Sequence, residues 1–406
     1  MGGGYHGKST LLKALETGVY PHVAGDGREY VTPDDTAVKI RAEDGRSIKK
    51  TDISMFINDL PNGKDTVLFC TEDASGSTSQ AANVIESMEA GTSLFLIDED
   101  TSATNFMIRD ELMQRVIHRE MEPITPFIER IRELYEKQGI STVIVAGSSG
   151  AYFHIADTIL QMDRYEPKDI TGYAKKEAEA FPAISLSQEP ARQPDFKRCP
   201  IANADLKGND RIKMKTMGKE AVMINKEMID LRYVEQIVDS EQVTALGYCM
   251  RYAQKHLMNG KKDLRQVIAE MEKVIEKESL DALCESRSSI ACMAMPRAQE
   301  IFACFDRYRK LKLYKRVFAE KENDQDEAER NSKMKFIHLS DLHIGKHLYH
   351  YNMKEDQEHI LEEVIGYTEK LRPDAVVIAG DIYDKSVPSA EAGAVFYDFL
   401  TTASSG

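Results

Sequence analysis

A phosphate-binding motif at residues 2–10 constrains the fold of this chain more than any other feature. These residues read GGGYHGKST and match the pattern G-x-x-x-x-G-K-[ST]. In such a loop, backbone N–H groups surround phosphate oxygens, the lysine reaches the β- and γ-phosphates, and the next hydroxyl can bind Mg²⁺. A glycine-rich start that arose by chance would require the helical pattern of residues 11–15 to be a coincidence. The motif therefore predicts contacts to ATP from Gly2, Gly4, Gly7, Lys8, Ser9 and Thr10.

The motif begins at the second residue, which leaves no sequence for the strand that normally precedes such a loop. We therefore expect that an N-terminal segment is missing. Without that strand, the cradle of backbone N–H groups would lack its usual anchor.

The composition is that of a soluble protein with two or three domains. The chain has 406 residues, of which 42% are hydrophobic and 30% charged. Its apolar stretches are too short to span a bilayer and no signal segment is visible, so we expect a cytoplasmic location. Six cysteines without C-x-x-C spacing argue against a zinc knuckle. A net charge of −14 confines any nucleic-acid site to a local basic patch.

Apolar strands alternate with helical patterns over the first part of the chain. This alternation is typical of α/β proteins with a doubly wound parallel sheet. We predict strands at 66–70, 94–98, 142–146 and 158–162, and helices at 80–88 and 124–138, the second opened by Pro123.

Changes in composition divide the chain into four parts. An ATPase core is expected at 1–165, and an accessory region at 166–318 is mixed at first, with short strands near 212–224, and helical from about 233. A low-hydrophobicity acidic linker follows at 319–333, and a new α/β pattern begins at 334 and continues to 406.

A second motif of nucleotide hydrolysis ends the strand at 94–98. The run SLFLIDE places two carboxylates at the carboxyl edge of the sheet, beside the phosphate loop. Asp98 would bind Mg²⁺ and Glu99 would polarise the attacking water, so Glu99 and Lys8 are the predicted catalytic residues. Such a strand alone is more often an ordinary strand end, but after a G-K-S-T loop the Walker B interpretation is favoured.

Two further runs resemble motifs of ABC-type ATPases. Residues 98–105, DEDTSATN, match five of eight positions of the D-E-P-T-S-A-L-D run of that class. Residues 74–80, ASGSTSQ, lie at a helix start where the class carries its L-S-G-G-Q signature. A Ser/Thr-rich, N-capped helix explains these residues equally well. The resemblance implies that the γ-phosphate is contacted by Ser75, Gly76, Ser77, Ser79 and Gln80.

With the phosphate loop and residues 234–239, VEQIVD, these runs resemble the predicted ATPases of the ABC class over residues 1–317. The family has an additional N-terminal domain, which is absent here. It implies a P-loop fold, ATP and Mg²⁺ as cofactors, and a homodimer, because the signature of one subunit closes over ATP bound by the other. It also implies no membrane span, and nucleic acid is a candidate partner.

Two positions depart from the ABC pattern. Ser148 stands where the class has its switch histidine, and Glu43 is only a weak candidate for the Q-loop glutamine. Hydrolysis is therefore expected to be slow or differently gated.

A basic segment at 307–316, RYRKLKLYKR, interleaves cations with aromatic residues. Such a segment could bind phosphates and stack bases. The favoured alternative is the solvated face of an amphipathic helix, because charge runs usually have that role.

The C-terminal part carries a candidate metal site. Two predicted strands end in Asp-x-His and Gly-Asp, so that Asp341, His343 and Asp381 would meet at one sheet edge. Two-metal hydrolysis requires such a shared carboxylate.

Residues 334–406 resemble the N-terminus of SbcD-type nuclease subunits, which are calcineurin-like phosphoesterases. The resemblance implies Mn²⁺ at Asp341, His343 and Asp381, flanked by His347 and supported by Asp384, and a partner ATPase of the SbcC type. The later ligand motifs of that family are absent from this sequence, so we expect this segment not to cleave DNA.

Three interpretations remain open. The first is an ABC-class ATPase with an inert nuclease fragment. The second is a nuclease subunit, acting in DNA repair, fused to an ATPase. The third is a non-catalytic nucleotide-binding or interaction protein. The first explains the larger set of motifs, and a joining of two neighbouring genes, with both outer ends lost, explains why both families occur in one chain.

Overall fold

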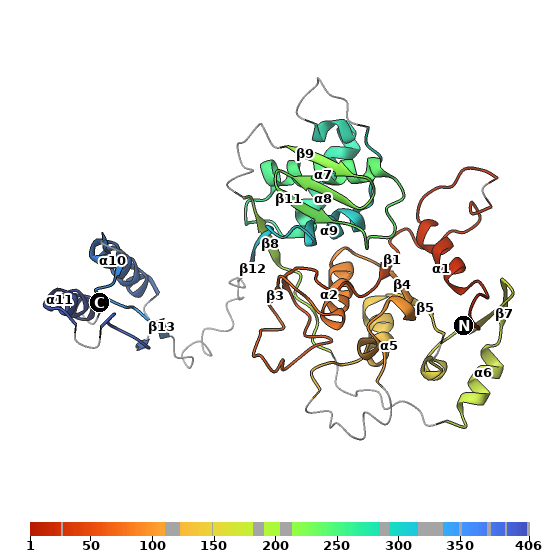
Figure 1. The fold of residues 1–406 in the computed structure, drawn as a ribbon, viewed down its shortest axis with the longest axis horizontal. Coiled ribbons are helices and arrows are strands. Elements are labelled where there is room, and N and C mark those ends of the chain that lie inside the picture. The colour runs from red at the N-terminus through yellow and green to blue at the C-terminus, as the bar shows by residue number, and fades with distance from the viewer. Residues whose placement is uncertain are drawn as a thin grey trace, which may run out of the picture. The chain divides into compact units, whose positions relative to one another are not determined.

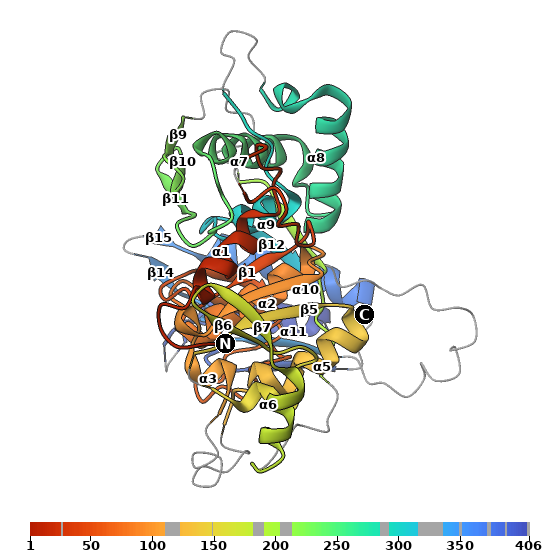
Figure 2. The ribbon, with the colours of Figure 1, turned by 90° about the vertical axis from the view of Figure 1, so that its right-hand side faces the viewer.

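The computed structural model divides into two compact units, Met1–Val317 and Phe318–Gly406 (Figures 1 and 2). It describes residues 1–25, 27–109, 122–147, 149–181, 191–203, 213–284, 292–315, 336–348, 351–371, 375–385 and 388–403. The acidic linker predicted at 319–333 and the switch position Ser148 lie outside the described residues. No helix among the described residues is both long and apolar enough to cross a membrane.

A parallel sheet forms the centre of the first unit, as predicted. Its strands are β1 (Val38–Ile40), β4 (Leu94–Asp98) and β5 (Ser141–Val145), in the order β1-β4-β5. Along β4, side chains alternate between the two faces. Leu96 packs with Leu12 of α1 (Lys8–Thr17), whereas Phe95 and Ile97 belong to the larger core that contains α2 (Gly76–Glu89) and α5 (Phe127–Gln138). The sheet is therefore covered on both faces.

Two predicted strands lie near their expected positions but outside this sheet. β3 (Phe69–Thr71) pairs antiparallel with β2 (Ile48–Thr51), and β6 (Leu160–Asp163) pairs antiparallel with β7 (Glu166–Asp169). The strand predicted at 158–162 is present as β6, but the turn at 164–165 returns the chain directly into a hairpin with β7, so β6 does not join the central sheet. Short helices connect these elements: η1 (Glu99–Thr101), α3 (Thr104–Met107), η3 (Ala151–His154) and α6 (Thr171–Ala178).

The predicted helix at 124–138 begins later than expected. It starts at Phe127, after Pro126 rather than Pro123, and ends at a left-handed Gly139. Phe127 packs against Phe106, with ring centroids 6.1 Å apart, at the centre of the core.

The accessory region was predicted at 166–318, but β7 pairs with β6 and α6 contacts η3, so we use this name from here on for residues 198–315, drawn in green and teal in Figure 1. An antiparallel sheet of β9 (Met214–Met217), β10 (Ala221–Ile224) and β11 (Glu227–Asp230) packs on helices. A separate core holds this region together. The helices are α7 (Ser240–Tyr252), η4 (Ala253–Leu257), α8 (Leu264–Glu278), η5 (Leu280–Leu283) and α9 (Ala298–Asp306).

The expectation that helix continues to residue 318 was wrong. After α9 the chain forms β12 (Lys312–Lys315), which pairs antiparallel with β8 (Arg198–Ile201). Leu313 is buried and Tyr314 exposed, so the residues alternate with the period of a strand.

The second unit contains the two strands predicted from its motifs. β13 (Phe336–Ser340) and β16 (Ala375–Ala379) pair in parallel, and α10 (Lys354–Leu371) connects them in sequence. A short hairpin of β14 (His347–Leu348) and β15 (Tyr351–Asn352) precedes α10, and α11 (Ala390–Ala403) follows β16.

Candidate nucleotide-binding site

The phosphate loop leads directly into α1. Gly7 has φ 94° at the N-cap, and a Cβ atom there would lie 2.5 Å from the ring of Tyr165, so glycine is required. The ammonium group of Lys8 donates to the carbonyl oxygens of Gly2 at 2.6 Å and Gly3 at 2.8 Å. Lys8 therefore lies over its own loop, where a phosphate could accept its hydrogen bonds instead.

The β6–β7 hairpin anchors this loop. The amino group of Met1 donates to Leu160 O at 2.8 Å, and the amide of Met162 donates to Met1 O at 2.6 Å, as in a parallel strand pair. The amide of Tyr165 donates to His6 O at 3.1 Å. We expected the loop to lack an anchor, and these contacts supply one. A largely apolar groove of about 400 Å³, bordered by Met1 and Leu160, separates the hairpin from β5.

The loop hydroxyl and the Walker B carboxylate come together. Ser9 Oγ donates to Asp98 Oδ2 at 3.4 Å, although the two residues are 89 positions apart. Asp98 is 7% exposed and ends β4, and its Oδ1 accepts from the amide of Asp100 at 3.3 Å. A hydroxyl and a carboxylate are hard oxygen donors of the kind that Mg²⁺ prefers, so this pair fits the ion.

Glu99 lies at the same sheet edge. Its Oε2 accepts a hydrogen bond from the amide of Gly147 at 2.7 Å, just beyond the end of β5. Burial raises the pKa of the nearby Tyr152 hydroxyl, and the charge of Glu99 raises it further. The Glu99 carboxylate, which was predicted to orient water, is therefore held in place by the backbone just beyond β5.

The predicted signature residues divide into two sets. Ser79 and Gln80 are fully buried, and Gln80 bonds Ser102 Oγ at 3.0 Å and the amide of Ala103 at 2.8 Å. Gln80 therefore ties α2 to the segment after Walker B.

The other signature residues lie at the start of α2, where Ser75 is exposed, Gly76 half-buried and Ser77 buried. Ser75 is its N-cap and shares a 2.6 Å hydrogen bond with Thr78, and Ser77 Oγ donates to Asn105 Oδ1 at 2.6 Å. Gly76 begins the helix between them. The contacts of Gln80 and Asn105 were not predicted, and no local pattern in the sequence signals them.

The basic segment is largely engaged within the chain. Arg307 pairs with the buried Glu43, and Arg309 donates to Glu72 O at 2.8 Å. Lys310 pairs with Glu227 at 2.6 Å. The alternative of a solvated helical face was wrong, because this segment is a turn followed by a strand.

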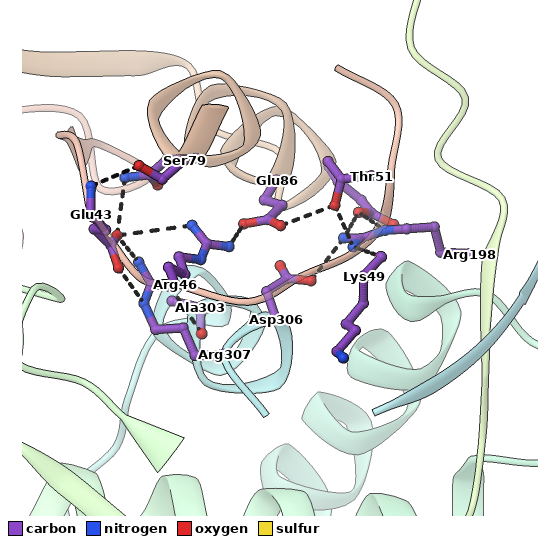
Figure 3. Close-up of polar contacts among 12 residues, drawn as sticks. Glu43, Arg46, Lys49, Thr51, Ser79, Glu86, Arg198, Ala303, Asp306 and Arg307 are labelled. Atoms are coloured by element: carbon purple, nitrogen blue, oxygen red, sulfur yellow. Dashed lines mark hydrogen bonds and ion pairs between the residues drawn. The ribbon is translucent and has the colours of Figure 1, made fainter. Parts of the chain in front are cut away.

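A buried network of charges joins the ATPase core to the accessory region (Figure 3). Arg46 pairs with Glu86 of α2, and Arg198 of β8 pairs with both Glu89 and Asp306. Burial raises the pKa of Asp306 to about 7, although Arg198 opposes the shift. Sequence reasoning missed this network.

The candidate metal residues of the second unit meet at one edge. Asp341 Oδ1 accepts from the amide of Asp381 at 3.2 Å, and the amide of His343 donates to Asp381 O at 2.9 Å. Asp384 lies 3.9 Å from the His343 ring nitrogen Nδ1. Within the described residues, no group of three or more His, Cys, Asp or Glu side chains is arranged to hold a metal ion.

Three family models match the chain. Residues 1–197 match the P-loop domain of ABC ATPases, and residues 213–314 match the MRB1590 C-terminal domain. Residues 334–402 match the calcineurin-like phosphoesterase family.

Curated relatives match shorter stretches. The uncharacterized protein MJ1628 of Methanocaldococcus jannaschii is 34% identical over 144 residues, which are 35% of this chain and 31% of that protein. The SbcD component of the nuclease SbcCD from Staphylococcus epidermidis is 49% identical over 59 residues, or 14% of this chain and 16% of that protein. The Staphylococcus saprophyticus protein of the same name is 44% identical over 59 residues. The chain spans less than a third of the length of these relatives.

Proposed function

The chain carries a P-loop domain of the ABC ATPase type followed by a calcineurin-like phosphoesterase segment, and from this premise we propose that its first unit binds and hydrolyses ATP. The observation that carries the proposal is the hydrogen bond between Ser9 and Asp98. Two motif residues that must act on one Mg²⁺ are adjacent in space, with Lys8 at the same loop.

Each residue has a defined role in this proposal. Lys8 exchanges its bonds to loop carbonyls for bonds to phosphate oxygens, and Ser9 and Asp98 hold Mg²⁺, which would offset phosphate charge. Glu99, held by Gly147, orients the attacking water and accepts its proton.

We further propose a homodimer through the ATP sites. A subunit's own loop would leave one side of its phosphates open. The exposed Ser75 and the half-buried Gly76 at the start of α2 suit that side in a second copy, with the buried Ser77 behind them. Ser79 and Gln80 would support this surface from within.

ATP binding and turnover of Lys8→Ala and Glu99→Gln variants test the ATPase proposal. Lys8→Ala should lose ATP binding, whereas Glu99→Gln should bind ATP and turn over about 10²–10⁴-fold more slowly. Lys13→Ala, on the same helix but away from the loop, is the matched control. Equal and weak values for the native chain and both test variants would refute the proposal.

For residues 334–402 we propose that a complete nuclease site requires more ligands than Asp341, His343 and Asp381. The hydrogen bonds among these three residues each involve a backbone group: the Asp381 amide donates to Asp341 Oδ1, and the His343 amide donates to Asp381 O. Incubation of the chain with Mn²⁺ and duplex DNA, in the absence and presence of an SbcC-type ATPase, should show no cleavage. Cleavage that is lost in Asp381→Ala would contradict this proposal.

A further inference from the structure

The segment after β1 contacts both sides of the candidate ATP site. The amide of Ala42 donates to Thr101 O at 3.1 Å, beyond Walker B. The amide of Glu43 donates to Ser79 Oγ at 2.8 Å, and Ala74 N donates to Arg46 O at 3.0 Å, both at the start of α2. We call residues 42–46 the connector.

Helix α9 of the accessory region holds the connector through one residue. The guanidinium of Arg307 grips the carboxylate of Glu43 in a bidentate pair, with Nε 3.2 Å from Oε2 (Figure 3). Arg307 Nη1 also donates to Ala303 O at 3.0 Å, so the side chain is fixed on its own helix. The side chains of Glu43 and Arg307 are 4% and 7% exposed. Burial alone would raise the pKa of Glu43, but Arg307 and Arg46 hold it below its usual value.

The other end of α9 holds the beginning of the same strand. Arg297 Nη1 donates to the carbonyl oxygens of Asp35 at 2.6 Å and Ala37 at 3.0 Å, just before β1. Glu300 accepts from the hydroxyl of Tyr20, beyond the end of α1, at 2.8 Å. Helix α9 therefore binds the chain on both sides of β1, which is the strand that pairs with the Walker B strand.

We propose that Arg307 is a positioning residue. By holding Glu43, whose amide donates to Ser79, it fixes the position of the N-terminus of α2, and it thereby couples the accessory region to ATP turnover. The inference rests on the proposed ATPase function. A guanidinium–carboxylate pair with two hydrogen bonds fixes direction as well as distance. Without Arg307, the buried Glu43 carboxylate keeps only longer contacts, to Arg46 at 3.9 Å and to Asn83 Nδ2 at 3.5 Å. Its burial is then poorly compensated, so the connector must move to solvate it.

This role predicts a split between binding and turnover. Lys8 and Ser9 bind ATP within one subunit, and they are positioned by the phosphate loop and α1 rather than by the connector. Ser75–Ser77 would act on ATP only when a second copy closes over it. Displacement of the connector should therefore slow turnover at saturating ATP and leave ATP affinity unchanged.

The experiment compares Arg307→Gln with Arg198→Gln in the full chain. Both variants break buried ion pairs that join the ATPase core to the accessory region. Arg307 pairs with Glu43 of the connector, whereas Arg198 pairs with Glu89 at the far end of α2 and with Asp306 of α9. Both should lose thermal stability. Only Arg307→Gln should lower kcat per folded molecule, by about 10-fold or more, with the Kd for ATP within about 2-fold of the native value.

A milder variant covers the case in which Arg307→Gln does not fold. Ser79→Ala removes the hydroxyl that accepts the Glu43 amide, and it should lower kcat about 3-fold with unchanged ATP affinity. Equal kcat losses in Arg307→Gln and Arg198→Gln, or an unchanged kcat in Ser79→Ala, would overturn the inference. A native chain that binds ATP without turnover or does not bind it at all would instead refute the ATPase proposal, and the coupling inference with it.

Discussion

Helices α1 and α2 of the candidate ATP site begin differently from α7 and α8 of the accessory region. Within the part of the chain that the structure describes, α1 and α2 have no side-chain cap on a backbone amide and no acidic residue in their first turns. Helices α7 and α8 each begin with a full capping box, in which Asp239 or Asp263 pairs with a glutamine three positions later.

The presence or absence of a capping side chain matters because the N-terminus of a helix attracts negative charge. The free N–H groups and the positive end of the helix dipole favour an anion. In α7 and α8 the chain supplies its own carboxylate, which stabilises the fold. In α1 and α2 these groups have no such carboxylate, and under the proposed function they would bind phosphate instead.

Gly7→Ala should produce the largest change, a loss of ATP affinity, because it disrupts the start of α1. A residue with a side chain at φ 94° costs about 1–2 kcal/mol, and its Cβ would displace the Tyr165 ring. We expect ATP affinity to fall by about 100-fold, measured by calorimetry. Gly172→Ala, in a helix start with open space around the glycine, is the control and should leave affinity unchanged. Unchanged ATP affinity in Gly7→Ala would mean that this helix start does not bind phosphate.

Ser75→Asp should turn the start of α2 into a capped one like those of the accessory region. The added carboxylate should raise the free energy of unfolding by about 0.5–1 kcal/mol. If ATP is hydrolysed in the proposed homodimer, Ser75→Asp should also lower turnover by about 10-fold, because its carboxylate would repel the phosphates of ATP bound by the second subunit. Ser75→Ala, which removes the hydroxyl without adding charge, separates the two effects. A rise in stability with unchanged turnover would place this helix start outside the ATP site.

The candidate site residues that the sequence placed at one sheet edge, and that lie together in the structure, share one physical origin. Walker B was identified because an apolar run ends in carboxylates, and the topology of a parallel sheet then brings Asp98 to the loop at Ser9. Local pattern and general topology were enough for these residues.

The residues that were missed depend on distant pairing. Glu43 and Arg307 are 264 positions apart, and nothing near either residue identifies its partner. The charges of residues 307–316 were taken for a surface feature for the same reason. The strand at Lys312–Lys315 was missed because four residues are too few to outweigh a preceding helical pattern.

Asp306→Asn should change the pH dependence of stability at the junction of the two regions. Burial raises the pKa of Asp306 from 3.8 to about 7, so the folded state keeps a proton that the unfolded state releases. The contribution of Asp306 to stability is therefore present below about pH 4 and is lost as the pH rises toward 7, with a slope of at most about 1.4 kcal/mol per pH unit. Urea unfolding of the native chain between pH 4 and 8 should show this decline, and Asp306→Asn should show a flatter profile. Parallel profiles for the two proteins would mean that Asp306 is charged in the folded state.

Asp263→Ala should have the smallest effect. It tests whether the cap of α8 in the accessory region contributes to stability but not to ATP turnover. Asp263 Oδ1 accepts from the amide of Gln266 at 2.8 Å, and the Gln266 side chain accepts from the amide of Asp263 at 3.1 Å. Loss of this cap should cost about 1 kcal/mol in urea unfolding and leave ATP turnover per folded molecule unchanged. Asp263→Asn, which keeps an acceptor at the cap, should recover most of the stability. If turnover fell in Asp263→Ala but not in Asp263→Asn, the start of α8 would be coupled to the ATP site, and capping would no longer separate the two kinds of helix.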